Sequence, residues 1–574
     1  MAGCKFSNEL NRLRKSSSDS IDNVEKFDSF KSYMHVVRTA EEDLKEILRK
    51  INASHKKTLV LLCGSAGDGK SHLLSYLKNS DEEQLIDRYF IYNDATESSA
   101  PNKTAIETLN EYLAPFKDIN LEEPGQNIIL AINLGVLSNF IESEYGDEYS
   151  VLRNYVEESN ILTSQVNNNE YEASSHFQHV SFSDYHMYSL TSDGIHAGYI
   201  EKILDKVFCE CEENLFYQSY IESCTSCPLS QKCPVKRNYE YMMNEERQQF
   251  VAELLVKSTI QDKVILTTRE ILNFIYNILI SQNFSYKEFQ EILIDDSAYL
   301  KEFLKQITPA LLFDSTDVTV LMNMLKKYDP LLARSEKADE NAISYYVSSD
   351  VSGEIRKAFS ENSYGDVICD STMIEKLNSD KTLKSSIYNL IVRILSIEEG
   401  TTNEETYCNY VKDLYWYNSG NGKKLGPLYG MIEKAVTQWC GSNEDGDLCL
   451  DSKHKGFYLY EKVEFEPRID HIPHPSDIDE LQRFIPTVVA AFNDPTGNRI
   501  ELDIDYSLYE LLYKLNQGYI QTADDRNNHA DFISFVNRIL QTGSLTKNIS
   551  VLSADGRKAT ISQGMFGYKF KVVK

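Results

Sequence analysis

Two patterns of apolar and polar residues follow one another along the first third of the chain. Residues 1–58 carry apolar positions at helical spacing, which predicts a helical N-terminal segment. Short, almost wholly apolar runs come next, and each has the length and the branched residues of a buried strand. The stretches between them are long enough to hold crossover helices. The pattern therefore predicts a parallel α/β sheet, with strands near residues 58–63, 89–92, 128–132 and 180–182.

The pattern changes twice further along the chain. Helical spacing dominates from about residue 196 to about residue 415, and strand-like runs return after about residue 420. Near the end, Asp555-Gly556 separates two strand-like runs, which is typical of a β-hairpin. A chain of 574 residues is also too long for one hydrophobic core. We therefore predict four parts: a helical N-terminal segment (1–58), an α/β core (59–260), a helical lid or helical domain (261–419) and a C-terminal mixed α/β domain (420–574).

The composition limits which partners and which location to expect. Lys and Arg number 59 against 87 Asp and Glu, which gives a formal charge of −28. Most of the surface must repel a phosphate backbone, so we expect the isolated chain to bind duplex DNA weakly. The first 20 residues contain no apolar stretch of signal-peptide length, and no stretch of the chain has the length of a bilayer-spanning helix. These features predict a cytoplasmic protein with no membrane partner, whose clustered cysteines are metal ligands rather than disulfides.

A glycine-rich loop follows the first predicted strand. The run Gly64-Ser65-Ala66-Gly67-Asp68-Gly69-Lys70-Ser71 matches the pattern G-x-x-x-x-G-K-[ST] in full, and a helical pattern follows it. In a phosphate-binding loop of this kind, backbone N–H groups and the positive end of the helix face the phosphates. Lys70 is expected to reach the β- and γ-phosphates, and Ser71 to ligate Mg²⁺. The sequence thus predicts an α/β fold of the P-loop NTPase (ASCE/AAA-like) type that binds ATP and Mg²⁺ through residues Gly64 to His72.

Hydrolysis of ATP needs further groups, and the sequence leaves the acidic one open. Such an acid usually closes a neighbouring strand, where it holds the metal or polarises water. Asp94 follows the second predicted strand and Asp184 follows the fourth, while the third ends in Asn133. The amide of Asn133 is able to sense the γ-phosphate but cannot act as a base. With Lys70, the catalytic candidates are therefore Asp94 and Asn133, and Asp184 is a further candidate acid.

Arg269 is a fourth catalytic candidate. It lies at the start of an amphipathic helix, after a threonine of the kind that caps helices. A guanidinium in that position can contact the γ-phosphate from a helical lid, as sensor and finger arginines do. An ordinary salt bridge to a nearby acid is the alternative interpretation.

Five of the eleven cysteines lie between residues 209 and 233. Cys224 and Cys227 have the C-x-x-C spacing that brings two sulfurs to one tetrahedral ion, and Cys233 follows them. A structural zinc site needs a fourth ligand, for which we take Cys209, with Cys211 or a remote histidine as alternatives. An iron–sulfur cluster fits the same cysteines. The third interpretation is that these cysteines bind no metal.

Several segments together resemble one family, the DptF proteins, the ATPase-like component of bacterial DNA phosphorothioation-dependent restriction systems. The glycine loop alone occurs in many unrelated proteins, but YNDATES, the cysteine-proline segment and the C-terminal block are more specific. The resemblance spans nearly the whole chain. The similar segments are YMHVVR at 33–38, LLCGSAGDGKSHLLSYL at 61–77, YNDATES at 92–98, AINLGVLSNFIE at 131–142, SFSDY at 181–185, CTSCPLSQKCPVKRNY at 224–239, LTTREILNFIYNIL at 266–279 and ELDIDYSLYELLYKLNQGYIQTADDRNNHADF at 501–532.

This resemblance implies an ATPase that acts with the partner proteins DptG and DptH in host defence against phage. Host DNA in such systems carries sulfur in place of a non-bridging phosphate oxygen, and the complex restricts DNA that lacks this mark. The chain would meet DNA through the complex. The sequence shows no catalytic metal-carboxylate motif for strand cleavage, so a nuclease activity of this chain is not supported.

Two other classes of function compete with this one. A nucleotide-binding scaffold without catalysis fits the lack of a clear Asp-Glu pair and the acidic surface. A signalling ATPase with no DNA role fits a nucleotide switch joined to a C-terminal sensor domain. The sequence leaves the oligomeric state open, a homo-oligomer included.

Overall fold

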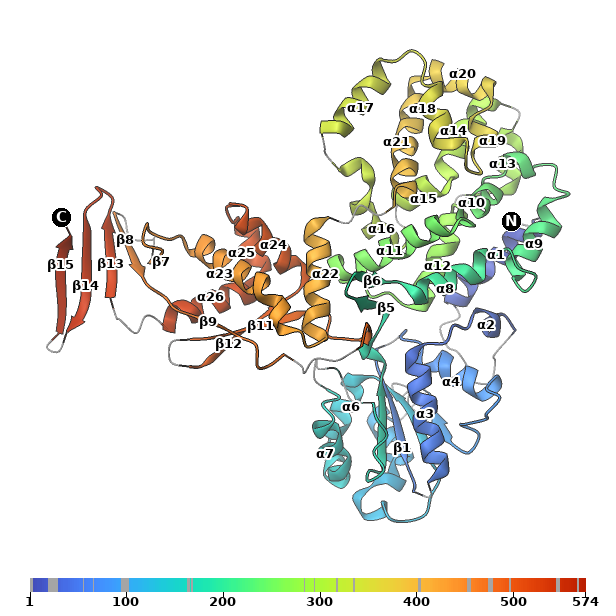
Figure 1. Cartoon of the computed structure of the whole chain (residues 1–574). Coiled ribbons are helices and arrows are strands. Elements are labelled where there is room, and N and C mark those ends of the chain that lie inside the picture. The colour runs from blue at the N-terminus through green and yellow to red at the C-terminus, as the bar shows by residue number, and fades with distance from the viewer. Residues whose placement is uncertain are drawn as a thin grey trace. The chain divides into compact units, whose positions relative to one another are not determined.

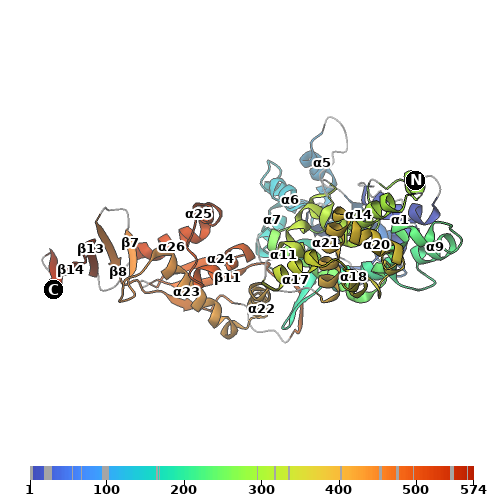
Figure 2. The same ribbon diagram turned by 90° about the horizontal axis from the view of Figure 1, so that it is seen from above.

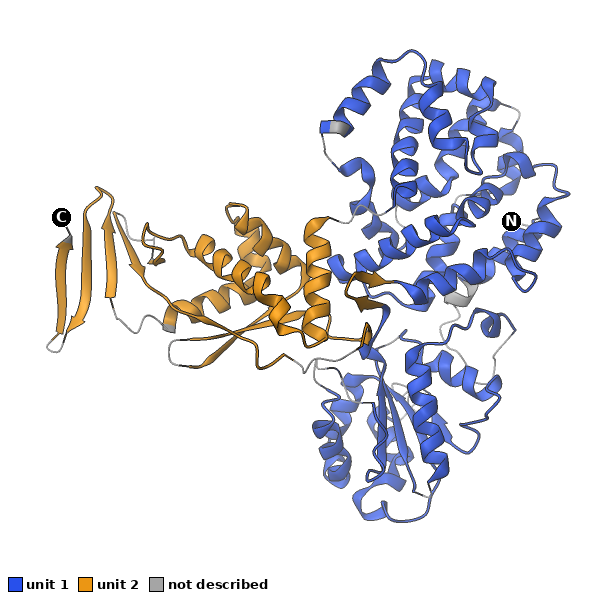
Figure 3. Cartoon of the chain, viewed as in Figure 1, with its two compact units in different colours: residues 1–188, 197–402 blue, residues 189–196, 403–574 orange. Residues whose placement is uncertain are grey.

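The computed structural model divides the chain into two compact units (Figure 3). Unit 1 comprises residues 1–188 and 197–402, and unit 2 comprises residues 189–196 and 403–574. The structure describes residues 4–18, 29–54, 56–65, 67–93, 103–162, 166, 169–282, 284–293, 295–315, 318–333, 336–400, 404–451, 456–472, 478–494, 497–542, 548–564 and 567–573.

A parallel sheet of four strands forms one part of unit 1. Its order is β2-β3-β1-β4, and the central strand β1 (Leu59–Cys63) pairs in parallel with both of its neighbours. The other strands are β2 (Phe90–Tyr92), β3 (Ile128–Ile132) and β4 (Phe177–Ser181). Every residue of β1, β3 and β4 is buried, as expected for strands covered on both faces. The predicted parallel sheet and its four strands are thus confirmed.

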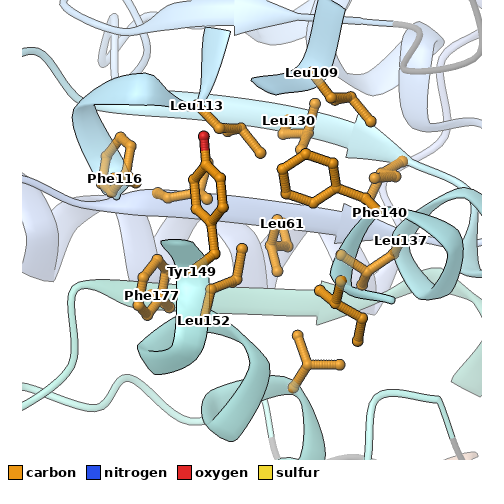
Figure 4. Close-up of a cluster of buried hydrophobic side chains, with 14 of the residues drawn as sticks. Leu61, Leu109, Leu113, Phe116, Leu130, Leu137, Phe140, Tyr149, Leu152 and Phe177 are labelled. Atoms are coloured by element: carbon orange, nitrogen blue, oxygen red, sulfur yellow. The ribbon is translucent and has the colours of Figure 1, made fainter. Parts of the chain in front are cut away.

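Helices cover both faces of this sheet (Figure 1). Leu61 and Leu130 pack on one face against α5 (Ala105–Tyr112), α6 (Leu134–Ile141) and α7 (Ser150–Glu158), where Figure 4 shows Leu109, Phe140 and Leu152 closing around them. The alternate residues of β1 face the other side and pack against α3 (Thr39–Ala53) and α4 (Lys70–Asn79). This two-sided burial fixes β1, and with it the position where the glycine loop begins.

The rest of unit 1 is helical, and Figure 2 shows α11, α14, α18, α20 and α21 gathered in one group. The helices of the N-terminal segment have different partners: α1 (Lys5–Ser18) packs against α9 and α12 in this part, α2 (Ser29–Met34) lies against α8, and α3 covers the sheet. The helices are α8 (Gly198–Phe208), α9 (Leu215–Cys224), α10 (Pro234–Met242), α11 (Glu245–Asp262), α12 (Thr268–Leu279), α13 (Tyr286–Ile292), α14 (Asp296–Gln306), α15 (Thr308–Asp314), α16 (Val320–Leu325), α17 (Glu336–Val347), α18 (Ser352–Phe359), α19 (Gly365–Ile368), α20 (Ser371–Ser379) and α21 (Lys381–Glu398).

Unit 2 combines helices with antiparallel strands. Its sheets have the orders β12-β11-β9 and β15-β14-β13-β8-β7, and the hairpin predicted at Asp555-Gly556 joins β13 to β14. Strand β5 (Tyr185–Thr191) runs from unit 1 into unit 2 and lies between β10 and β6. The remaining elements are β6 (Gly194–His196), β7 (Leu448–Asp451), β8 (Phe457–Glu461), β9 (Glu466–Arg468), β10 (Glu480–Arg483), β11 (Val488–Asn493), β12 (Arg499–Ile504), β13 (Asn548–Ser553), β14 (Lys558–Gly564), β15 (Gly567–Val573), α22 (Glu405–Asn418), α23 (Gly426–Cys440), α24 (Tyr506–Asn516), α25 (Ala523–Asn528) and α26 (Ala530–Thr542).

The C-terminal unit begins earlier than the residue 420 expected from composition. Helix α22 belongs to it because its side chains bond to the segment before β11. Tyr410 donates to the Pro486 carbonyl at 3.0 Å, and the Asn418 amide exchanges two hydrogen bonds with the backbone of Ile485.

Within the described ranges, the structure contains no helix with the length and hydrophobicity of a membrane-spanning segment.

Candidate functional site

The glycine loop joins the buried strand β1 to helix α4, as predicted. Three of its glycines have positive φ angles, which are 155° at Gly64, 92° at Gly67 and 95° at Gly69. Residues with a Cβ rarely adopt the left-handed backbone of Gly67 and Gly69, so the loop conformation requires glycine there. Ala66 lies outside the described residues. Helix α4 begins at Lys70, so its N-terminal N–H groups lie at the end of the loop.

Asp68 folds back across the loop. Its Oδ2 accepts a hydrogen bond from the Ser65 N–H, and a Cβ on Gly64 would lie 2.6 Å from the same oxygen. Burial raises the pKa of Asp68, and the nearby Lys70 charge opposes this rise. Lys70 Nζ donates to the Ser65 carbonyl at 2.6 Å. The loop therefore carries an ammonium group and a carboxyl group side by side.

A cavity of 340 Å³ opens beside the loop, a volume in the range of small-ligand sites. Gly67, Gly69, Lys70, Ser71 and His72 all line it, so most of the nucleotide-binding residues predicted from sequence surround one space. Apolar side chains contribute as well, from the segment before α3 and from α4 and α12. These are Phe30, Met34, Val36, Leu73 and Leu272. The wall thus has a polar part made by the loop and apolar parts that suit a flat organic ring.

The ends of the neighbouring strands bring amides to this cavity. Asn133 follows β3 and lines the cavity, and its side chain caps α6 by accepting a hydrogen bond from the Gly135 N–H at 2.9 Å. Asn93 follows β2 and also lines the cavity, whereas Asp94 lies outside the described residues. Asp184 is buried after β4, accepts a hydrogen bond from Ser181 at 3.2 Å and is not part of the cavity wall. Of the strand-end candidates that the structure describes, Asn133 lines the cavity together with the loop residues and Asp184 does not.

Helix α12 closes the cavity from the helical part of unit 1. Thr267 caps it, and a capping box with Glu270 confirms the start predicted from sequence. Arg269, in the first turn, is exposed and lines the cavity. Within the described part of the chain no ion pair joins Arg269 to an acidic side chain.

Arg38 is a site residue that sequence reasoning did not single out. Its guanidinium donates to the Asp68 carbonyl of the loop at 2.9 Å and to the Tyr185 carbonyl at 3.1 Å. It also lies 5.3 Å above the ring of Tyr199, whose hydroxyl is 2.7 Å from Thr268 Oγ1. Arg38 thus links the loop, the segment after β4 and the start of α12. Only its place in the YMHVVR segment gave any signal, because its partners are remote in sequence.

A second side-chain network holds the start of α4. His72 Nε2 lies 3.2 Å from Nδ1 of His35, and the ring of His35 stacks on Tyr76 with centroids 3.6 Å apart. His35 Nε2 is 2.9 Å from the buried carboxylate of Glu41, which Lys45 also contacts. His72 lines the cavity, and its contact with His35 fixes its ring.

The predicted cysteine ligands do not all come together. Cys224, Cys227 and Cys233 are free thiols, but Cys209 forms a disulfide with Cys211. This disulfide contradicts the prediction of Cys209 as the fourth metal ligand. A disulfide sulfur carries no thiolate charge with which to bind a metal ion. In the ranges that the structure describes, no three His, Cys, Asp or Glu side chains already converge closely enough to hold a metal ion.

Comparisons of this chain with protein-family profiles, with curated proteins and with solved structures give no match. The site is therefore interpreted from its own geometry.

Gly67 provides a test of the contact between the loop and α12. A Cβ there would lie 2.9 Å from Cγ2 of Thr267, whose rotamer the capping box fixes, whereas a Cβ on Gly69 meets nothing closer than 3.8 Å. Alanine is strained by positive φ at both positions, at a cost of about 1–2 kcal/mol. We expect Gly67→Ala to lose about 1–3 kcal/mol more, from overpacking against Thr267. Calorimetric melting of both full-length variants without nucleotide measures this, and equal losses of Tm would contradict the contact.

Proposed function

We propose that the chain binds ATP with Mg²⁺ in the cavity beside the glycine loop and hydrolyses it. One observation carries this proposal: a loop with positive-φ glycines connects a buried parallel strand to a helix, with Lys70 and Ser71 on the cavity wall. Backbone N–H groups there, together with the N-terminus of α4, favour a polyphosphate. Lys70 would bind the β- and γ-phosphates. Ser71 would hold Mg²⁺, which when bound neutralises phosphate charge.

The remaining wall residues take roles around the γ-phosphate. The Asn133 side chain is already oriented by its bond to the Gly135 N–H, so the amide nitrogen is held at the strand end to contact phosphate or water. Arg269 supplies a guanidinium from the first turn of α12. Such a group offers paired donors to the charge that develops on the transferred phosphoryl group. Asp94 is the acid that the sequence predicts to hold the metal or polarise water.

The biological setting we propose rests on the sequence resemblance. The chain would be the ATP-hydrolysing component of a DNA phosphorothioation-dependent restriction complex, acting with DptG and DptH on DNA that lacks the sulfur mark. The formal charge of −28 supports a division of labour in which the partners supply most of the DNA affinity. Strand cleavage would then belong to another component of the complex.

A nucleotide-binding scaffold without catalysis is the second candidate. The described strand ends that line the cavity carry the amides Asn93 and Asn133 rather than carboxylates. An amide orients a ligand but cannot accept the proton of an attacking water.

Steady-state ATP turnover separates these candidates. We would measure it for the full chain alone, with duplex DNA, and with DNA and both partners, and titrate labelled DNA in parallel at several salt concentrations. DNA-stimulated turnover and weak DNA binding by the chain alone support the restriction ATPase. Tight ATP binding without turnover under every condition supports the scaffold, and an absence of ATP binding would refute both.

A further inference from the structure

The N-terminal helix brings a cysteine to the cysteine-rich segment from more than two hundred residues away. Cys4 directly precedes α1, and α1 packs along α9. Phe6 makes edge contacts with Tyr220 and with Tyr239, at centroid distances of 5.7 and 5.0 Å, and Lys5 pairs with Glu222. Glu222 lies two positions before Cys224, the last residue of α9. The start of α1 is therefore held at the end of α9 where the cysteine segment begins.

The three cysteines of that segment lie on a compact turn between α9 and α10. The Cys227 N–H lies 3.4 Å from the Cys224 carbonyl, and the Ser230 N–H donates to the Cys227 carbonyl at 3.1 Å. Cys233 then caps α10, and its carbonyl accepts from the Arg237 N–H. A chain that reverses in this way brings C-x-x-C sulfurs toward a common point.

The thiols lie where α1, α9 and α10 pack together. Phe6, two residues after Cys4, contacts Tyr220 of α9 and Tyr239 of α10. The Cys4 Sγ accepts a hydrogen bond from the Ser7 N–H at 3.4 Å, and the Tyr286 hydroxyl lies 3.4 Å from Cys227 Sγ. Cys224 is buried, and the other three thiols are half-buried. Four partly covered thiols in one region of packing offer the ligand set of a tetrathiolate zinc site.

We propose that Cys4, Cys224, Cys227 and Cys233 bind one Zn²⁺ as a tetrathiolate site. Cys4 takes the place that sequence reasoning gave to Cys209, which the disulfide to Cys211 removes. The described thiols do not yet converge to coordination distance, so binding requires their side chains to turn inward. All four lie at helix termini or on a turn, where such rotations leave the helices in place. Zinc would then tie the first helix of the chain to α9 and α10.

The first experiment counts metal. We would purify the full chain under reducing conditions with added zinc and determine zinc, iron and sulfide by elemental analysis. About one zinc per chain is expected for the natural sequence and for the control Cys209→Ser/Cys211→Ser. Cys4→Ser should weaken zinc binding by more than the roughly 10–100-fold that loss of an outer-shell partner costs. Its Tm should fall as well, because metal binding contributes to folding.

The second experiment needs no variant, so it holds even if Cys4→Ser fails to fold. We would alkylate the thiols of the natural chain with and without zinc and identify the modified residues by mass spectrometry. Zinc should protect Cys4, Cys224, Cys227 and Cys233 together and leave Cys369 and Cys408 unchanged. Equal modification of Cys4 with and without zinc, a chain that takes up no zinc, or iron and sulfide in its place would each overturn the proposal.

Discussion

The Lys70→Ala chain is expected to hydrolyse ATP at no measurable rate while keeping its fold. The ammonium group lies on the cavity wall and bonds to the Ser65 carbonyl, so its removal leaves no hole in the core. Loss of a charge-assisted contact costs about 1.5–3 kcal/mol in ATP binding. Loss of charge stabilisation in the transition state lowers kcat by a further factor of about 10² to 10³.

Lys78→Ala is the matched control, because Lys78 is an exposed lysine in the last turn of the same helix. Phosphate release and ATP titration by calorimetry measure both steps, and circular dichroism checks the fold. Normal turnover by Lys70→Ala would refute the role given to the loop, and a loss of equal size in Lys78→Ala would refute its specificity.

Arg269→Ala is expected to lower kcat strongly and ATP affinity only weakly. The side chain is exposed on the first turn of α12 and lines the cavity, so truncation should leave the fold unchanged. Arginines that stabilise a transferred phosphoryl group contribute about 10³ to 10⁵ in kcat. Arg269→Lys should recover only part of this, because an ammonium lacks the planar pair of donors.

Single-turnover rates and ATP affinity of both Arg269 variants separate catalysis from binding. Lys263→Ala is a suitable control, since Lys263 is exposed at the C-terminal end of α11 and lies outside the cavity wall. A variant that loses affinity and keeps kcat would make Arg269 a binding residue rather than a catalytic one.

Local patterns in the sequence predicted the parts of the structure that depend on neighbouring residues. The apolar run before Gly64 predicted β1, the threonine before Arg269 predicted a capped helix, and Asp555-Gly556 predicted a hairpin. Each of these follows from the conformations and burial of a few consecutive residues.

Contacts between remote residues could not be predicted in the same way. Arg38 reaches Asp68 and Tyr185, and Cys4 reaches the 224–233 segment, only because whole helices pack together. The start of unit 2 was placed too late for a related reason. The apolar face of α22 shows that the helix is buried but does not show that Pro486 and Ile485 are its partners.

Helix α1 is synthesised long before the two helices that it packs against. Phe6, Leu10 and Leu13 of α1 are buried, and the partners of α1 are α9 and α12, which end at Cys224 and Leu279. At about 5–20 residues per second, the ribosome completes these partners roughly 10–50 seconds after α1 has been made. The parallel sheet, by contrast, has all its strands once Ser181 is added. The apolar face of the amphipathic helix α1 therefore stays exposed until its partners are made, while the sheet that follows it can already fold, and exposed apolar surface of this kind is what chaperones protect.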